Sequence, residues 1–382
     1  MNTLKNYGNN LEVKIQEFNL TENNIITAAG HFDIQGSIVN IEECNNGHIN
    51  RTYFLTYDTG KRYVMQMVNT DIFNKPDELM ENIVSVTEHI RHGYEAKGID
   101  PDRRALHVVW TKSGKWGHVD RRGIYWRMYD FIEDSNCYMQ VESAEMFEKV
   151  GIAFGQFQRQ LADFDASTLH ESIPNFHNTE WRYENLEKAI AENKSGRANL
   201  VSDEIKFALD RKDITSYINK NIENGSLTLR VTHNDTKLNN IMMDKTTGEG
   251  ICVIDLDTVM PGSVLADFGD SIRFGASSAK EDETDLDAVY CRLDMFEAFA
   301  KGFIGGLEGS LTESEIRALP MGALILTYET GIRFLTDYLD GDVYFRVAHP
   351  NHNLDRARNQ FKLVADMEEK LDEMKKIVEI YI

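Results

Sequence analysis

The sequence is poor in the features that mark secreted, zinc-binding and membrane proteins. Only six prolines and four cysteines occur in 382 residues. The cysteines (Cys44, Cys137, Cys252 and Cys291) are widely spaced without a C-x-x-C pair, so we expect reduced core residues, not a disulfide framework or zinc site. No apolar run approaches the ~18 residues that cross a bilayer, and residues 1–20 lack a signal-peptide pattern. The sequence therefore predicts a cytoplasmic protein without membrane association.

Positive charge is scarce as well. Lys and Arg number 41 against 62 Asp and Glu, which gives a net charge of −21. Such a chain repels polyphosphate backbones, so we expect no nucleic-acid partner. The acidity has two interpretations: it confers solubility, or it favours cationic substrates. Nothing in the sequence indicates a protein partner.

The periodicity changes along the chain, and this predicts an α+β fold with two lobes. Alternating patterns predict strands in the first third, and a helical face formed by Leu79, Ile83, Val86 and Ile90 predicts one helix over 77–91. From Ser143 onward the spacing is helical. The expected strands are 37–44, 51–57, 62–68, 105–110 and 123–132. Further helices are expected at 179–191, 203–222, 285–303, 313–339 and 354–381. We expect a small antiparallel β-sheet lobe over 1–132 and a mainly helical lobe over 133–382.

One motif in the second lobe carries the chemistry. His233-x-Asp235-x4-Asn240 follows an apolar strand and precedes a hairpin, whose second strand leads to Asp255. This spacing is typical of a kinase catalytic loop. Asp235 would align an acceptor hydroxyl and take its proton, and Lys237 could reach the transferred phosphoryl group. A turn or helix cap is the other interpretation of Asp235.

Two oxygen ligands are predicted for a metal ion. Asn240 and Asp255 offer the hard donors that Mg²⁺ prefers. Asp257 is a rival ligand, because side chains on one strand alternate and Asp255 and Asp257 would share a face. Asp267, in a literal Asp-Phe-Gly, is expected to cap the next helix or brace the catalytic loop, with contact to the metal ion as the alternative.

Several longer blocks are more specific than this motif. Residues 47–50, 232–240, 253–262, 267–276 and 333–362 resemble N-acetylhexosamine 1-kinases, within the aminoglycoside phosphotransferase and choline kinase-like family. The resemblance spans the chain from about residue 30. It implies a bilobal protein-kinase-like fold, ATP as co-substrate and Mg²⁺ as cofactor. It also implies a hinge at Tyr129, Asp130, Phe131 and Ile132, whose backbone would meet the adenine.

The resemblance also implies an acceptor site. It places His48, Phe274 and Arg333 there, together with Asp235. Taken alone, His48 would be a turn residue and Phe274 a core residue. Arg333 alone would be a structural partner of Glu329 at i−4.

The first lobe departs from related kinases at one position. Gln66 stands on the third strand where those enzymes carry a phosphate-binding lysine. An amide donates hydrogen bonds but supplies no charge. Mg²⁺ together with Lys61, Arg62 or Lys75 would have to compensate. The sequence has no Walker A motif and no G-x-G-x-x-G, which argues against P-loop and Rossmann folds.

The sequence thus predicts a small-molecule kinase that phosphorylates the anomeric C1 hydroxyl of N-acetylhexosamines, with a sugar and ATP as its partners. A kinase of choline, homoserine or an aminoglycoside remains an alternative. A pseudokinase that only binds its ligands is a further one. Gln66 favours the pseudokinase slightly, whereas Asp235, Asn240 and Asp255 argue against it.

Overall fold

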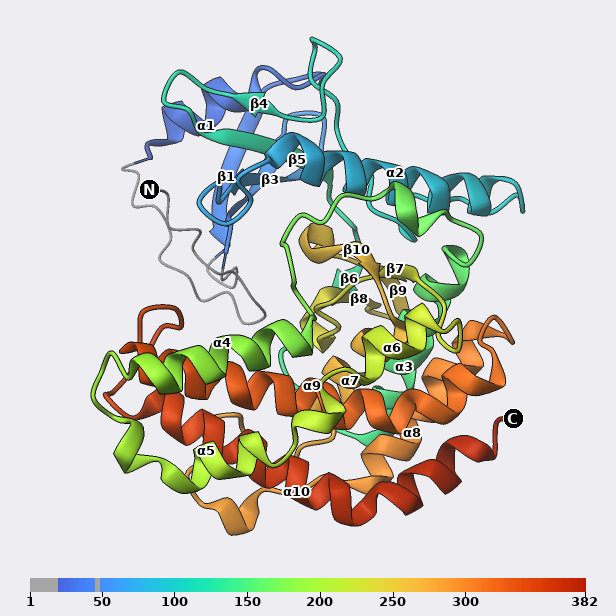
Figure 1. The fold of residues 1–382 in the computed structure, drawn as a ribbon. Helices are drawn as coiled ribbons and strands as arrows, with labels where there is room; N and C mark the ends of the chain where they lie inside the picture. The colour runs from blue at the N-terminus through green and yellow to red at the C-terminus, as the bar shows by residue number, and fades with distance from the viewer. Residues whose placement is uncertain (1–19, 45–48) are drawn as a thin grey trace.

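The first part of the chain forms an antiparallel sheet flanked by helices. The computed structural model describes residues 20–44 and 49–382. The sheet has the strand order β1-β2-β3-β5-β4. Its elements, with the helices of this part, are α1 (Glu22–Ala29), β1 (Ile38–Cys44), β2 (Arg51–Tyr57), β3 (Arg62–Val68), α2 (Pro76–Glu95), β4 (His118–Val119) and β5 (Tyr125–Asp130). In Figure 1 helix α2 runs beside this sheet, above the helical part of the molecule.

The second part is mainly helical and carries two small sheets. In Figure 1 helix α9 crosses it with α4 on one side and α10 on the other. The helices are α3 (Ala144–Gln160), α4 (Thr179–Glu192), α5 (Ser202–Leu209), α6 (Tyr217–Glu223), α7 (Val264–Gly275), α8 (Leu293–Leu307), α9 (Glu313–Asp340) and α10 (His352–Glu379). The strands are β6 (Ser135–Asn136), β7 (Arg230–Thr232), β8 (Ile241–Asp244), β9 (Gly250–Val253) and β10 (Met260–Gly262). They pair as β6-β8-β9 and β10-β7.

Helices α7 and α9 pack closely against each other at Gly269 and Gly322. A Cβ on Gly269 would lie 2.4 Å from the carbonyl oxygen of Gly322, so these backbones approach more closely than any other residue would allow. This contact matters because both helices carry predicted site residues.

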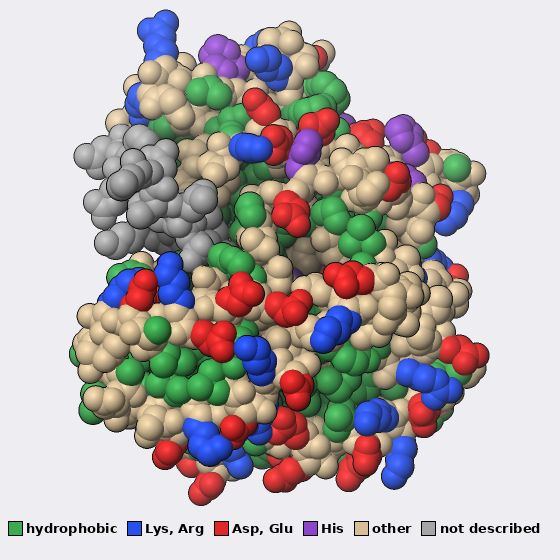
Figure 2. Space-filling model, viewed as in Figure 1, with side chains coloured by type: hydrophobic (Ala, Val, Ile, Leu, Met, Phe, Trp, Pro, Cys, Tyr) green, Lys and Arg blue, Asp and Glu red, His purple; other side chains and the backbone are tan. Residues whose placement is uncertain are grey.

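A single hydrophobic cluster joins the two parts. It combines Val68 and Ile83 from the first part with Phe157, Leu256 and Met260 from the second. The surface is nevertheless hollowed between the two parts on the face shown in Figure 2. Burial of these apolar side chains stabilises the two parts together.

The predicted fold class is confirmed, and most element predictions agree with the structure. The strands at 51–57 and 62–68 have the predicted bounds, and all four apolar positions predicted for α2 are buried. α1 and β4 were not predicted. Among the described residues no helix is long and apolar enough to span a membrane.

Four predictions were wrong. Residues 105–110 form only one isolated bridge, Val108 to Tyr129, because β4 takes part of the same edge of β5. The helix expected at 203–222 is broken into α5 and α6, and the one expected from 285 begins at Leu293. Cys137 is exposed and Cys44 partly so, whereas Cys252 and Cys291 are core residues as expected.

Candidate active site

The loop between β7 and β8 is held from α7. The Asp267 carboxylate accepts the backbone N–H groups of His233 (3.0 Å) and Asn234 (2.7 Å). Asn234 has a φ of 65°, a left-handed conformation that non-glycine residues seldom adopt. The bracing role predicted for Asp267 is therefore confirmed. The cap of α7 is Ser263 instead.

Asp235 follows this turn and has two close partners. Lys237 Nζ lies 2.7 Å from Oδ1, and Asn240 Nδ2 donates to Oδ2 over 3.0 Å. Burial alone would raise the pKa of Asp235, but Lys237 and the other neighbours outweigh it and lower that pKa. The carboxylate is thus ionised and able to accept a hydrogen bond from a hydroxyl.

Asp255 lies beside Asn240. The N–H of Ile254 donates to the Asn240 carbonyl over 2.8 Å, and His233 Nε2 lies 2.9 Å from the Ile254 carbonyl oxygen. Asp255 itself has a φ of 58° and an exposed side chain. Such outliers cost of order 1–3 kcal/mol and cluster at functional sites.

These residues fit a magnesium ion. Although Asp255 is partly exposed, the protein atoms around its carboxylate desolvate it, and together with the carboxylates of Asp257 and Asp235 they raise its pKa to about 7. A divalent cation would relieve this accumulation of negative charge. Asn240 uses Nδ2 for both hydrogen bonds that it donates to Asp235, which leaves its amide oxygen to face a cation. Asn240 and Asp255 are therefore the residues that would hold Mg²⁺.

Asp257 does not share a face with Asp255. β9 ends at Val253, and the left-handed Asp255 turns the chain into the short 3₁₀ helix η5 (Leu256–Thr258). The Asp257 carboxylate is buried and bound by Arg127 of β5, with Nη1 to Oδ1 at 2.5 Å and Nη2 to Oδ2 at 2.9 Å. Asn50 Nδ2 donates to Oδ2 over 2.6 Å. The expectation that Asp257 lies beside Asp255 on one strand face was wrong.

Gln66 is part of the same contact. Its Oε1 accepts from Arg127 Nε over 2.9 Å, and its Nε2 donates to Thr52 Oγ1 over 3.0 Å. Both ends of the amide are therefore engaged within the sheet. The role predicted for Gln66 in nucleotide binding remains a prediction.

Two of the three cations expected to compensate for Gln66 are engaged at the surface. Arg62 pairs with Glu133 and lies 3.8 Å over the Phe131 ring, and Lys75 pairs with Glu78. The third, Lys61, is exposed.

The predicted hinge lies where β5 leaves the sheet. Tyr129 is buried, with its ring 5.3 Å from the Arg127 guanidinium carbon. Asp130 binds His107 Nδ1 through its carboxylate (2.6 Å), and the N–H of Phe131 donates to the Arg62 carbonyl. Ser135 Oγ donates to the Ile132 carbonyl. The side chains of Tyr129 and Asp130 thus have structural partners, and contact with adenine remains a prediction for the backbone.

A second charged cluster lies behind the catalytic loop. His177 places Nε2 3.2 Å from the Asn234 carbonyl oxygen and Nδ1 3.0 Å from Glu329 Oε1. Thr179 donates to the other Glu329 oxygen over 2.6 Å. Glu329 is buried on α9, one turn before Arg333. The cluster therefore connects the backbone beside Asp235 to the helix that carries Arg333.

Arg333 is buried without a full set of partners. Only 6% of it is exposed, yet neither Nη1 nor Nη2 has a hydrogen-bond partner among the described residues. Among the described residues, Arg333 does not form the ion pair that was expected with Glu329. Burial and the neighbouring Arg333 lower the pKa of Arg182 to about 10. Two cations thus crowd one buried carboxylate.

Phe274 and His48 are the other two residues predicted for the acceptor site. Phe274 ends α7 and is 40% exposed, so it is not a core residue. It lies one turn after Ser271, whose hydroxyl donates to the Thr236 carbonyl of the catalytic loop. His48 lies outside the described residues.

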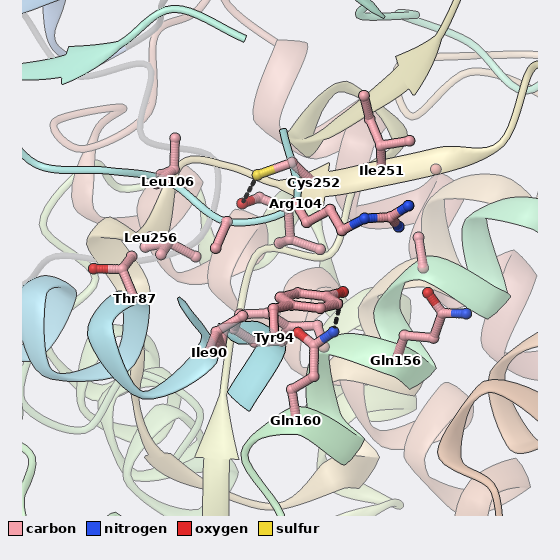
Figure 3. Close-up of a pocket in the computed structure, with 15 residues that line it drawn as sticks. Thr87, Ile90, Tyr94, Arg104, Leu106, Gln156, Gln160, Ile251, Cys252 and Leu256 are labelled. Carbon is pink, nitrogen blue, oxygen red and sulfur yellow. Dashed lines mark hydrogen bonds between the residues drawn. The ribbon is translucent and has the colours of Figure 1, made fainter. Parts of the chain in front are cut away.

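The structure also contains a separate pocket. Figure 3 shows it between α2, residues 104–106, α3 and β9, with Gln160 donating to the Tyr94 hydroxyl. Cys252 lines it, and burial raises the pKa of this thiol to about 12. None of the predicted site residues lines this pocket.

Comparison with known proteins agrees with this geometry. Residues 40–298, more than half of the chain, match the APH group, described as the phosphotransferase enzyme family. The chain belongs to this family. Similar solved structures include a microcompartment-associated aminopropanol kinase (TM-score 0.60, 14% identity, 93% of this chain and 99% of that one). An amicoumacin kinase in complex with AMP-PNP and Ca²⁺ (0.59, 13%, 89% and 92%) and a choline kinase from Cryptosporidium parvum (0.54, 14%, 94% and 99%) are also similar. At such identities the similarity shows the fold of this phosphotransferase and not its substrate.

Sequence reasoning missed three residues of these clusters: Arg127, His177 and Arg182. Arg127 had a signal, because it is the lone charge in the apolar run from Ile124 to Met128. A charge inside a buried strand needs a partner. His177 and Arg182 lie in an ordinary polar stretch and gave no such signal.

Proposed function

We propose that this phosphotransferase is a Mg²⁺- and ATP-dependent kinase of the anomeric C1 hydroxyl of N-acetylglucosamine or N-acetylgalactosamine. The observation that carries the proposal is Arg333, a buried cation one turn after Glu329, whose Nη atoms have no hydrogen-bond partner among the described residues. A buried donor without a partner costs about 1–3 kcal/mol, which a ligand with acceptor oxygens would recover. The resemblance of residues 267–276 and 333–362 to N-acetylhexosamine 1-kinases supports the same conclusion.

The charge of the second cluster disfavours a cationic acceptor. Arg333 and Arg182 lie together near a single carboxylate, Glu329, which Thr179 and His177 already bind. An ammonium group entering here would meet like charges in a poorly solvated site. A neutral sugar offers hydroxyl and acetamide oxygens to the arginines. The net charge of −21 is then a property of the surface, where it favours solubility.

The catalytic loop would act on the acceptor hydroxyl as follows. Ionised Asp235 accepts the hydrogen bond of the hydroxyl, orients its oxygen and receives the proton as transfer proceeds. Lys237, 2.7 Å from Asp235, holds that carboxylate in place and lies where negative charge develops on the phosphoryl oxygens. The exposed ring of Phe274 offers a flat apolar wall to one face of the sugar.

Mg²⁺, when bound by Asn240 and Asp255, would neutralise charge on the donor phosphates. ATP as the donor is consistent with the AMP-PNP complex of the amicoumacin kinase, a protein of the same fold. The hinge backbone from Tyr129 to Ile132 is the proposed contact for its base.

An acceptor panel tests the proposal. We expect Mg-ATP turnover with free N-acetylglucosamine or N-acetylgalactosamine and none with the matching methyl glycosides, in which the anomeric oxygen is capped. Turnover only with choline, homoserine or an aminoglycoside would show that the protein is a kinase of another small molecule. Nucleotide binding without turnover of any acceptor would indicate a pseudokinase.

A further inference from the structure

Arg127 takes part in a hydrogen-bonded network that crosses from the first part of the molecule to the second. This network consists of Asn50, which directly precedes β2, of Thr52, Gln66 and Arg127 from the sheet, and of Asp257 from the second part. We call these five residues the Arg127 network. Arg127 and Asp257 are 1% exposed, and their carboxylate–guanidinium pair is bidentate.

The network disfavours a lysine at position 66. Gln66 and Arg127 lie directly opposite each other on antiparallel strands β3 and β5. Like charges in such a pair repel, whereas an amide oxygen accepts from the guanidinium. The positive charge that related kinases carry on the third strand therefore stands one strand away in this chain, and it faces Asp257.

The segment after Asp255 is held from two sides of the first part. Arg127 and Asn50 bind the Asp257 side chain, while Asn82 of α2 donates to the Val259 carbonyl over 3.0 Å. Leu256 and Val259 are buried in the cluster that joins the two parts. Asp255 is thus the exposed end of a segment that is otherwise fixed to the first part.

We propose that Arg127 is a positioning residue for the metal-side carboxylate. It supplies, from β5, the buried cation that the third strand lacks, and by holding Asp257 it sets the place of Asp255. Arg127 is buried, and its Nε, Nη1 and Nη2 all donate hydrogen bonds within the protein. It would therefore act through Asp257 and not by contact with phosphate. This inference requires the part of the proposed function in which Mg²⁺ and a nucleotide bind, and it does not depend on the acceptor.

The test is the Mg²⁺ requirement of nucleotide binding, measured by calorimetry with AMP-PNP and without any acceptor. Arg127→Lys keeps a cation near Asp257 but loses the bidentate geometry. Because outer groups that orient a metal ligand are worth ~10–100-fold in metal affinity, we expect the Mg²⁺ concentration for half-maximal AMP-PNP binding to rise about 10-fold or more. Binding of AMP in the absence of Mg²⁺ should stay within about twofold of the parent.

The matched control is Arg230→Lys. Arg230 makes a similar bidentate pair with the buried Glu315, and its side-chain hydrogen bonds go to Glu315 and the Ser310 carbonyl instead of to residues 255–259. The Arg230→Lys variant should have a lower melting temperature and an unchanged Mg²⁺ requirement. Equal Mg²⁺ requirements in both variants would overturn the proposal, since Arg127 would then only stabilise the fold. Weakened AMP binding in Arg127→Lys would overturn it too, because Arg127 would act on the nucleotide directly.

A second variant keeps the test decisive if Arg127→Lys does not fold. Gln66→Met removes the acceptor of Arg127 Nε and leaves the pair with Asp257. It should raise the Mg²⁺ requirement in the same direction by a smaller factor, and an unchanged requirement would count against the proposal. A parent that binds Mg²⁺ and AMP-PNP but fails to phosphorylate sugars removes the proposed function and leaves this inference standing.

Discussion

Two buried arginines, Arg127 on β5 and Arg333 on α9, have different surroundings. Arg127 donates through Nε, Nη1 and Nη2 to Gln66 and Asp257. Arg333 is buried almost as deeply and its guanidinium lies 5.6 Å from the Phe345 ring, yet its two Nη atoms have no hydrogen-bond partner among the described residues. A satisfied buried cation fixes structure, whereas an unsatisfied one retains donors for a ligand.

The difference separates the two sides of the proposed reaction. On the proposed nucleotide side, Arg127 and Asp257 neutralise each other, and Asn240 and Asp255 remain for the proposed metal ion. On the proposed acceptor side, Arg333 would bind the substrate. The predictions below test this contrast, from the largest expected effect to the smallest.

Arg127→Met should have the largest effect on stability. It leaves the Asp257 carboxylate buried without a cation, which costs roughly 3–5 kcal/mol of the free energy of unfolding. Urea denaturation measures it. The same substitution at Arg333 should cost about 1 kcal/mol or less, because little native bonding is lost there. Equal losses in the two variants would remove the contrast.

Asp235→Asn should have the largest effect on catalysis. It keeps the shape and removes the proton acceptor, so kcat should fall ~10²-fold or more while substrate binding changes little. Steady-state kinetics at saturating ATP and acceptor checks this. A variant that keeps more than about a tenth of the parent kcat would mean that Asp235 is not the base.

Arg333→Met should act on the acceptor alone. Loss of charged hydrogen bonds to the sugar should lower kcat/KM for the acceptor by roughly 1.5–3 kcal/mol, or about 10- to 150-fold. KM for ATP should change little. An equal loss for ATP and sugar would show that Arg333 does not discriminate between the two sides.

Gln66→Lys should have the smallest effect. From the sequence alone, a lysine here would be tolerated or would tighten ATP binding. Because Gln66 accepts from Arg127 and faces it across the sheet, we now expect a loss of about 1 kcal/mol in stability and no gain in ATP affinity. Tighter ATP binding by the Gln66→Lys variant, measured by calorimetry, would instead show that position 66 faces the phosphates.

Local patterns in the sequence predicted much of this molecule. Alternation located β2 and β3, helical spacing located α2, and the catalytic loop was found because its residues are close in the chain. The side chain of Asp257 was misplaced because the left-handed conformation of Asp255 ends the alternation of β9, and nothing in the sequence signals that φ. The partnership of Arg127 with Asp257 joins residues 130 positions apart, so no local pattern can reveal it.

The position of the phosphate in the product tests the central claim most directly. The free sugar, Mg-ATP and enzyme are incubated, and phosphorus NMR is recorded on the purified product. We predict a phosphorus signal coupled to the anomeric proton of N-acetylglucosamine or N-acetylgalactosamine. A phosphate on C6, or a phosphorylated product only from choline, homoserine or an aminoglycoside, would contradict the account.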